Sequence, residues 1–484
     1  MGIKEKLNRA GVLYKQQNFE PAVDILEKIL KKKPNLFDAC QLLALTLHGM
    51  GHNEAAIKLF HKTIINNPNH ASSVSNLANV YSDNGQLELA ESTYLKALKI
   101  DGNHSDAFNN LANVQRKLGR YFEAEKNYRK AIFCDASKAE YFFNLSILLS
   151  EQGMFKQAID IQLKVLELDS NYSNVYIHIF NNFMLLHRYQ DALEFADIGL
   201  LSNRLNEFQL CELLIGKAIL FWLFDNEGEA QQAIILSEII HNIENNHLNL
   251  KNHKVFHLFI KGLLEYRQRN RSSYQTSETP PIYFISESHG FAANGMTVDY
   301  KSSKHVIKSL LITGAKIFHF TQDRENQSKA SLNVLFNGLA KGSTIVLGFG
   351  EIDCRINEGI FKYCTKYNKD YHHIVDDMVE KYIYMLKSTA KTNDFNLIVY
   401  GVPAPHPFVL DQLTEAQRES FKSLLAYVNL KLSVHCENND LPFLDVYKLT
   451  NLNGVSNLNY HSDIFHVKPS TVPDLFKQLI EKIK

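Results

Sequence analysis

Residues 75–100 have the sequence SNLANVYSDNGQLELAESTYLKALKI, and this stretch decides the fold of the first half of the chain. It holds two helical patterns of about a dozen residues each, separated at Gly85. Glycine suits such a turn because a positive φ carries no steric penalty there. Ala90 falls where two packed helices come closest and a larger side chain would not fit. Neither helix can bury its apolar face alone, so neighbouring units must stack.

The unit recurs along the chain with a period of 34 residues, which predicts an all-α solenoid. Six alanines keep this spacing, four glycines keep it at the turn, and two prolines keep it between units. The alanines are Ala22, Ala56, Ala90, Ala124, Ala158 and Ala192; the glycines are Gly51, Gly85, Gly119 and Gly153; the prolines are Pro34 and Pro68.

These repeats resemble the tetratricopeptide repeat (TPR) family, in about six units over residues 4–203. The central units look most like the TPRs of O-GlcNAc transferases, because NLAN occurs at 76–79 and again one period later. In that family the first Asn lines the inner surface and holds the backbone of an extended peptide. The resemblance implies that Asn76, Asn110 and Asn144 bind a polypeptide in the TPR groove. The alternative is that they are solvated side chains on a helix face.

After the repeats the pattern changes twice. Residues 204–269 keep helical spacing without the period, which predicts two or three irregular capping helices. Residues 270–281 are polar, aperiodic and end in two prolines, as a linker does. Residues 282–484 alternate short apolar runs with helical stretches, which predicts an α/β domain with a parallel sheet covered on both faces. The expected strands are 282–285, 316–320, 344–347, 396–400 and 443–446.

Three polar clusters in this second half carry candidate chemistry: SESHG at 286–290, GFGEIDCR at 348–355 and DIFH at 463–466. The first two follow expected strands, where active sites of parallel sheets gather. A serine hydroxyl becomes a nucleophile when a base takes its proton. His466 is the candidate base, and Asp463 can hold its imidazole in the required tautomer.

A serine after the first strand and an Asp-x-x-His near the C-terminus resemble the SGNH/GDSL hydrolases over roughly 200 residues. The resemblance implies a three-layer, flavodoxin-like fold and a catalytic triad of Ser288, Asp463 and His466. It implies a serine-dependent O-acyl esterase or acyltransferase that acts on an acylated carbohydrate or glycoconjugate, with acetyl as the expected acyl group. Alternatively, the TPR array is the working part, as a binding scaffold, and the SGNH-like module is non-catalytic.

The third family block departs from its usual Gly-x-Asn-Asp, because Ile352 stands at the Asn position. An Ile side chain cannot donate to an oxyanion, so the hole would rest on the amides of Ser288 and Gly350. Arg355 is the candidate third donor or substrate anchor, with the Thr321-Gln322 turn as another source. Otherwise Arg355 is a structural ion-pair partner. The GEIDCR sequence looks like a variant block of bacterial SGNH-like domains.

The composition argues against several classes of protein. Lys+Arg and Asp+Glu both total 52, which gives no support for nucleic-acid binding. We expect no signal peptide, because residues 1–6 lead directly into a helical pattern, and no membrane insertion, because the most apolar helix-length stretch, 213–224, is short and broken by Lys217. The six cysteines are scattered and suit reduced thiols, so we expect a cytoplasmic location. No metal or cofactor is expected, because the polar residues of 371–377 do not share one helix face. His406 and His461 are expected near the catalytic cluster.

Overall fold

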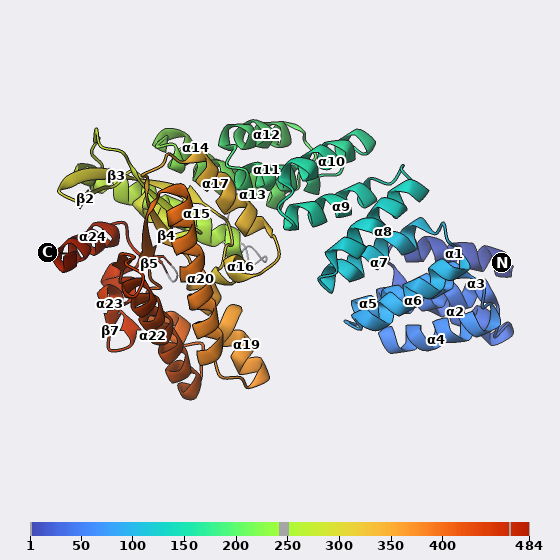
Figure 1. Ribbon diagram of the computed structural model, residues 1–484. Coiled ribbons are helices and arrows are strands. Elements are labelled where there is room, and N and C mark those ends of the chain that lie inside the picture. The colour runs from blue at the N-terminus through green and yellow to red at the C-terminus, as the bar shows by residue number, and fades with distance from the viewer. Residues whose placement is uncertain (1, 242–250, 464–465, 484) are drawn as a thin grey trace. The chain divides into compact units, whose positions relative to one another are not determined.

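The computed structural model describes residues 2–241, 251–463 and 466–483 (Figure 1). The chain divides into two compact units, each considered by itself. The first comprises residues 1–149 and 157–172, and the second comprises residues 150–156 and 173–484. The second unit therefore begins earlier in the chain than the linker expected at 270–281.

The first unit is a TPR solenoid, and its helices between residues 3 and 134 pack in consecutive pairs, two to a repeat. The periodic alanines of the first five repeats, like that of the sixth repeat in the second unit, have no exposed surface, because they lie where the helices press together. The four periodic glycines all have a positive φ, between 75° and 79°. The helices are α1 (Ile3–Lys15), α2 (Phe19–Lys32), α3 (Phe37–Gly49), α4 (Asn53–Asn66), α5 (Ala71–Asp83), α6 (Leu87–Ile100), α7 (Ser105–Lys117), α8 (Tyr121–Cys134), α9 (Ala139–Glu151) and α10 (Phe155–Leu168).

The second unit begins with the α9–α10 turn and the sixth repeat, and both pack on helix α17 (Gln327–Gly338) of the α/β part. A Cβ added at Gly153 would lie 2.3 Å from that of Ala330, and His187 Nε2 lies 2.9 Å from the Ser331 hydroxyl. Three capping helices follow, within the expected number. The sixth repeat consists of α11 (Asn174–Leu185) and α12 (Tyr189–Leu201), and the capping helices are α13 (Glu207–Leu223), α14 (Glu227–His241) and α15 (Lys251–Arg269).

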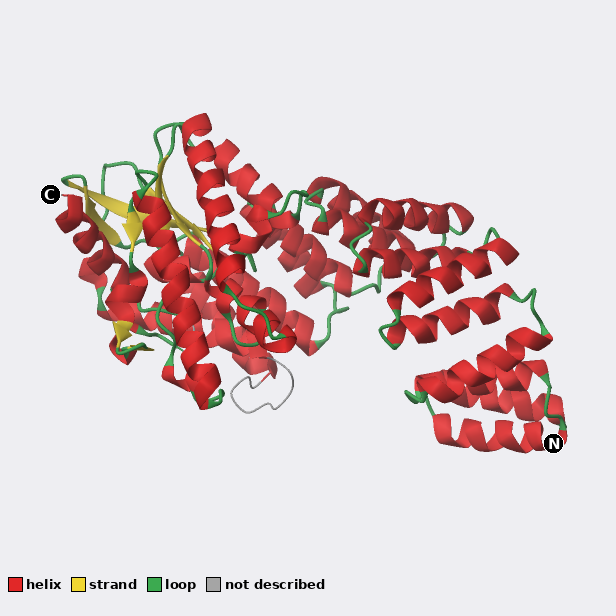
Figure 2. Ribbon diagram, turned by 60° about the horizontal axis from the view of Figure 1, so that its bottom comes forward, coloured by secondary structure: helices red, strands yellow, loops and turns green. Residues whose placement is uncertain are grey.

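Most of the strands in the second unit form one sheet of six, in the order β2-β3-β1-β4-β5-β6. Figure 2 shows the strands in yellow among the helices. Five of the six strands are parallel, whereas β2 pairs antiparallel with β3 at one edge. The sheet is therefore mixed, which corrects the expectation of a purely parallel one. The strands are β1 (Ile282–Ser286), β2 (Thr297–Tyr300), β3 (Ser303–Leu311), β4 (Thr344–Gly348), β5 (Asn396–Tyr400) and β6 (Phe443–Leu444).

The strand expected at 316–320 is wrong, because this segment forms the short helix α16 (Ile317–Thr321). The buried Asp353 carboxylate accepts the backbone N–H groups of Ile317 and Phe318 at 2.7 and 3.0 Å. A carboxylate at a helix N-terminus satisfies its unpaired donors. Ile317 and Phe320 are buried at helical spacing while Phe318 is exposed, so the apolar run forms one helical face.

Apolar clusters cover both faces of the sheet, because alternate strand residues point to opposite sides. Ile285 and Leu347 pack with helices of one layer, whereas Phe284 and Val346 pack toward α24. In the described ranges no helix is long and apolar enough to cross a membrane. The remaining elements are η1 (Arg271–Ser273), η2 (His289–Ala293), α18 (Glu351–Cys354), α19 (Gly359–Tyr367), α20 (His372–Asn393), α21 (Pro407–Leu410), α22 (Glu415–Glu437), α23 (Val446–Thr450), β7 (Asn451–Leu452), β8 (Val455–Ser456), η3 (Leu458–Tyr460) and α24 (Thr471–Ile483).

Candidate active site

The loop after β1 distinguishes its two serines. The Ser286 hydroxyl accepts the Gly290 N–H at 2.8 Å and donates to the Glu287 carbonyl at 3.0 Å, so it holds the loop together. Ser288 is also buried, but its hydroxyl contacts groups from a distant part of the chain. Ser286 pairs in register with Gly348 of β4, which brings the segments after β1 and β4 to one sheet edge.

The structure places Ser288, His466 and Asp463 in one hydrogen-bonded row. Ser288 Oγ lies 2.9 Å from His466 Nε2, and His466 Nδ1 lies 2.7 Å from Asp463 Oδ2. The other Asp463 oxygen accepts the His466 backbone N–H at 2.8 Å, which fixes the loop before α24. With Nδ1–H directed to a carboxylate, Nε2 is the imidazole atom that can accept the serine proton. Residues 464–465 of the DIFH sequence lie outside the described residues.

The capping helices cover this row of side chains. Phe259 of α15 stacks on the His466 ring, with ring centres 3.8 Å apart and planes 10° apart. Trp222 of α13 donates its indole N–H to the Phe291 carbonyl at 2.9 Å, and Asn294 donates to the Trp222 carbonyl at 2.9 Å. The loop that carries Ser288 is therefore held from two sides. No sequence pattern predicts these contacts, since apolar residues on a helix ordinarily indicate a core face.

Glu287 is a buried carboxylate in direct contact with Ser288. Its Oε2 accepts both the backbone N–H and the hydroxyl of Ser288, each at 2.7 Å, and its Oε1 bonds His289 Nδ1. Burial would raise the pKa of Glu287, but the charge of His289 and then that of Arg355 hold it below its ordinary value. Burial would lower the pKa of His289, whereas Glu287 raises it to about 9. Near neutral pH the two side chains form an ion pair.

Arg355 forms an ion pair with Glu351, one of the two partners considered from the sequence. Its Nε donates to both Glu351 oxygens at 3.0 and 2.8 Å, and a terminal nitrogen lies 2.7 Å from one of them. Glu358 lies 3.5 Å away, while Asp353 is used at α16. Burial opposes the charge of Arg355, but Glu351 and Glu287 raise its pKa. The guanidinium charge thus acts on Glu287 through space.

The other residues considered for the oxyanion hole occupy defined positions. Gly350 has a φ of 120°, and a Cβ there would lie 3.1 Å from both Ile317 and Val402, so only glycine fits this turn. Ile352 is buried and has no donor to offer. The Thr321 hydroxyl donates to a carbonyl of its own helix at 3.0 Å.

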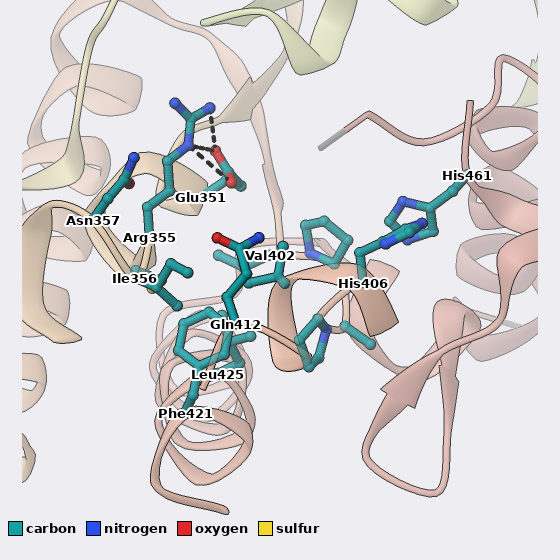
Figure 3. A pocket seen from close by; sticks show the side chains of 15 residues that line it. Glu351, Arg355, Ile356, Asn357, Val402, His406, Gln412, Phe421, Leu425 and His461 are labelled. Atoms are coloured by element: carbon teal, nitrogen blue, oxygen red, sulfur yellow. Dashed lines mark hydrogen bonds and ion pairs between the residues drawn. The ribbon is translucent and has the colours of Figure 1, made fainter. Parts of the chain in front are cut away.

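A pocket of about 120 Å³ opens beside these residues (Figure 3). Glu351 and Arg355 stand at one side, and His406 and His461 stand at the other. His461 contacts the Asp463 carbonyl at 3.2 Å, and burial first, then the charge of His406, lowers its pKa to about 4. The floor between the two sides is mainly apolar. Its members include Val402, Ala404, Val409, Phe421 and Leu425.

Among the described residues, Glu287, His289 and Glu351 form the one cluster with metal-ligand spacing, their ligand atoms lying within 4.8 Å of one another. His289 and Arg355 already balance these carboxylates, so the cluster does not require a cation to be neutral. The residues of 371–377 do not form such a group in the part of the chain that the structure describes.

In the first unit, successive first helices are joined by asparagine side chains. Asn110 donates to Asn79 at 3.0 Å, Asn109 donates to Asn110 at 3.1 Å, and Asn144 donates to Asn109 at 3.0 Å. Asn76 is half-buried and makes no side-chain hydrogen bond with the described residues. Two of the three predicted peptide-binding amides thus belong to a network between helices, and each keeps unused hydrogen-bonding capacity.

The second Asn of each NLAN sequence has a structural role that the sequence did not reveal. Asn79 accepts the hydroxyl of Tyr94, and Asn113 accepts that of Tyr128 at 2.6 Å. Both tyrosines are fully buried on the second helix of their repeats. The signal was present in the period, since each Tyr follows its Asn by fifteen residues.

Comparisons with known proteins bear on the repeats. Residues 13–143 match the family model of the Psidin N-terminal TPR repeats region, and residues 139–172 match a tetratricopeptide repeat model. No curated protein matches the chain. Similar solved structures include PilF of Pseudomonas aeruginosa (22% identity, TM-score 0.37, 43% of this chain and 92% of that chain). Others are the C-terminal part of a TPR repeat-containing protein from Cytophaga hutchinsonii (17%, 0.40, 50% and 96%) and a TPR protein from Parabacteroides merdae (13%, 0.40, 53% and 98%).

Proposed function

We propose that this chain, in which residues 13–172 are TPR repeats, is a serine-dependent O-acyl esterase or O-acyltransferase with an SGNH-like catalytic domain. One observation carries the proposal: Ser288 Oγ lies 2.9 Å from His466 Nε2, whose ring is held by Asp463 at 2.7 Å. The serine follows the first strand and the histidine precedes the last helix, which is the order of the resembling hydrolases.

The proposed reaction has two steps. His466 takes the Ser288 proton as Oγ attacks the acyl carbon, and the same proton passes to the alcohol oxygen that leaves. The acyl group is then an ester of Ser288. A water molecule or an acceptor hydroxyl, deprotonated by His466, attacks that ester and restores the free serine. Asp463 keeps the imidazole in the tautomer that both steps need.

A pocket that adjoins the triad through His461, and that Ser288 and His466 do not themselves line, supports a short acyl group. Its volume of about 120 Å³ is somewhat smaller than a cavity of roughly 150 Å³ that holds benzene. An apolar floor suits an acetyl methyl or a slightly longer chain. A carbohydrate or glycoconjugate as the alcohol part of the substrate rests on the SGNH resemblance alone. Gly350 and Arg355 are the proposed oxyanion or substrate groups.

The TPR repeats support recruitment of a polypeptide partner or substrate, since arrays of this kind generally bind polypeptides. We assign the contact to Asn76, Asn110 and Asn144, whose amides can still bond a peptide backbone. Two features favour the second candidate, a TPR scaffold with a non-catalytic module. Ile352 removes an oxyanion donor, and Glu287 occupies the Ser288 N–H.

The test is covalent labelling with an uncharged fluorophosphonate, followed by mapping of the labelled peptide. We expect labelling of the full chain on Ser288 and none in Ser288→Ala. Ser286→Ala is the matched control, and it should keep the label if its loop stays folded. A label on Ser286, or no label on either the folded wild-type chain or folded Glu287→Ala, would reject the esterase assignment and leave the scaffold as the better account.

A further inference from the structure

The contact between Glu287 and Ser288 has a consequence for the proposed reaction. A single carboxylate oxygen, Glu287 Oε2, lies 2.7 Å from the Ser288 nitrogen and 2.7 Å from its Oγ. In acyl transfer to a serine, the oxyanion lies close to the serine Oγ and accepts the backbone N–H of that serine. Glu287 Oε2 occupies the same surroundings at Ser288. Substrate oxygen and Glu287 Oε2 therefore compete for one place.

The proton count at Ser288 gives an independent reason for competition. The hydroxyl has one proton and two acceptors within reach, His466 Nε2 at 2.9 Å and Glu287 Oε2 at 2.7 Å. A proton donated to Glu287 is not available to the base. The contact thus opposes both requirements of the first step, proton transfer to His466 and stabilisation of the oxyanion.

We propose that Glu287 is an internal plug of the oxyanion site, so that acyl substrates react only after its carboxylate turns away from Ser288. The inference rests on the proposed function. Once displaced, the carboxylate still has partners for its charge: His289 bonds its other oxygen, and Arg355 acts on it from the adjacent cluster. The plug can therefore move within its charged surroundings without leaving an unpaired buried ion.

Displacement rather than protonation is the expected release. Burial would raise the pKa of Glu287, but His289, Arg355 and the Ser288 hydroxyl together keep it below its ordinary value, so moderate acidity leaves the carboxylate charged. A substrate carbonyl that binds the Ser288 N–H would have to displace a charge-assisted hydrogen bond, which is among the stronger kinds. Resting activity on small esters should accordingly be low.

The test compares the rate constant of fluorophosphonate labelling, and p-nitrophenyl acetate hydrolysis, between the wild-type chain and Glu287→Ala. We expect the variant to react about tenfold faster or more, since one oxyanion donor is worth about 10²–10³ in rate. Glu358→Gln is the matched control, because it also changes a carboxylate near Arg355 but does not touch Ser288. It should stay within about twofold of the wild type.

Each other outcome overturns the plug in a distinguishable way. Equal rates would reject it and leave the esterase proposal standing, while slower labelling of folded Glu287→Ala would make Glu287 a positioning residue instead. Absence of labelling in every folded variant would reject both proposals. If Glu287→Ala does not fold, a structure of the phosphonylated wild type decides. The phosphonyl oxygen should occupy the Ser288 N–H, and Glu287 still bonded there would refute the plug.

Discussion

The asparagine network of the first unit and the charged cluster around Ser288 satisfy their buried polar groups in different ways. The network joins neutral amides across repeated helices, and each amide donates to the next at about the same distance. The Ser288 cluster joins ionised groups of both signs at a single place. Neutral, repeated amides suit recognition of a peptide backbone, whereas fixed charges in a dry site suit stabilisation of charge that develops in a reaction.

The largest expected effect tests the chemistry of the second region. His466→Ala should lower kcat on a small ester by about 10³–10⁴ or more, because the serine loses its base. Binding of a peptide by the TPR array should be unchanged. Steady-state kinetics and peptide titration of the same preparation measure the two together. A loss of both activities would mean that the variant is misfolded or that the regions are not independent.

The next largest effect concerns Phe259, whose ring covers the His466 ring. Phe259→Ala leaves the His466 ring without its stacked partner and opens a cavity in a fully buried position, which typically costs about 3–5 kcal/mol. We expect a lower melting temperature together with a lower kcat. Phe259→Leu is the control, since it refills most of the volume without the ring. Equal activity of both variants and the wild type would show that the stacking does not orient His466.

The third prediction concerns Arg355 and distinguishes a catalytic or substrate-binding role from a structural one. If its charge supports the oxyanion, Arg355→Met should lower kcat on a small neutral ester, by up to about 10²-fold. If it anchors substrate, only the KM for an anionic substrate should rise. The ion pair with Glu351 allows a third result, a lower melting temperature with unchanged kinetics. That result would assign Arg355 to structure alone.

The smallest effect is expected in the asparagine network. Replacing Asn76, Asn110 and Asn144 by Ala should weaken the binding of an extended peptide that was selected on the wild-type array. The expected loss is about 0.5–1.5 kcal/mol for each hydrogen bond removed. Ester hydrolysis should not change. Asn109→Ala is the matched control, because Asn109 is buried and belongs to the same network. If the triple variant and Asn109→Ala lose the same amount of peptide-binding free energy, the loss comes from disturbed helix packing and not from missing contacts with the peptide.

The sequence predicted those features that repeat or that depend on neighbouring residues. The TPR helices followed from a fixed period, and β1, β4 and β5 followed from short apolar runs. The helix at 317–321 was missed because its cap, Asp353, is distant in sequence and no local pattern reveals it. The β2–β3 hairpin was missed because charged residues interrupt its apolar alternation at one edge of the sheet.

The candidate site shows the same limit. Ser288, Asp463 and His466 were singled out from chain order, and the structure brings their side chains together. The role of Glu287 does not follow from its position beside Ser288, because the direction of its carboxylate depends on how the loop after β1 folds. Phe259 had no distinguishing mark, since its ring meets His466 only through the tertiary fold. Contacts between separate elements are the part that one sequence leaves open.

The capping helices α13 and α15 contact the loop of Ser288 and the ring of His466, and this limits where the protein can be cut or recombined. A protease or a gene rearrangement that separated the chain at 270–281 would free an α/β piece with Phe291, Ala292 and Leu311 bare of their apolar partners. That piece would also lack the ring that lies on His466. The α/β part is therefore not a portable module. To be transferred in working form, it would have to bring with it the capping helices and the sixth repeat.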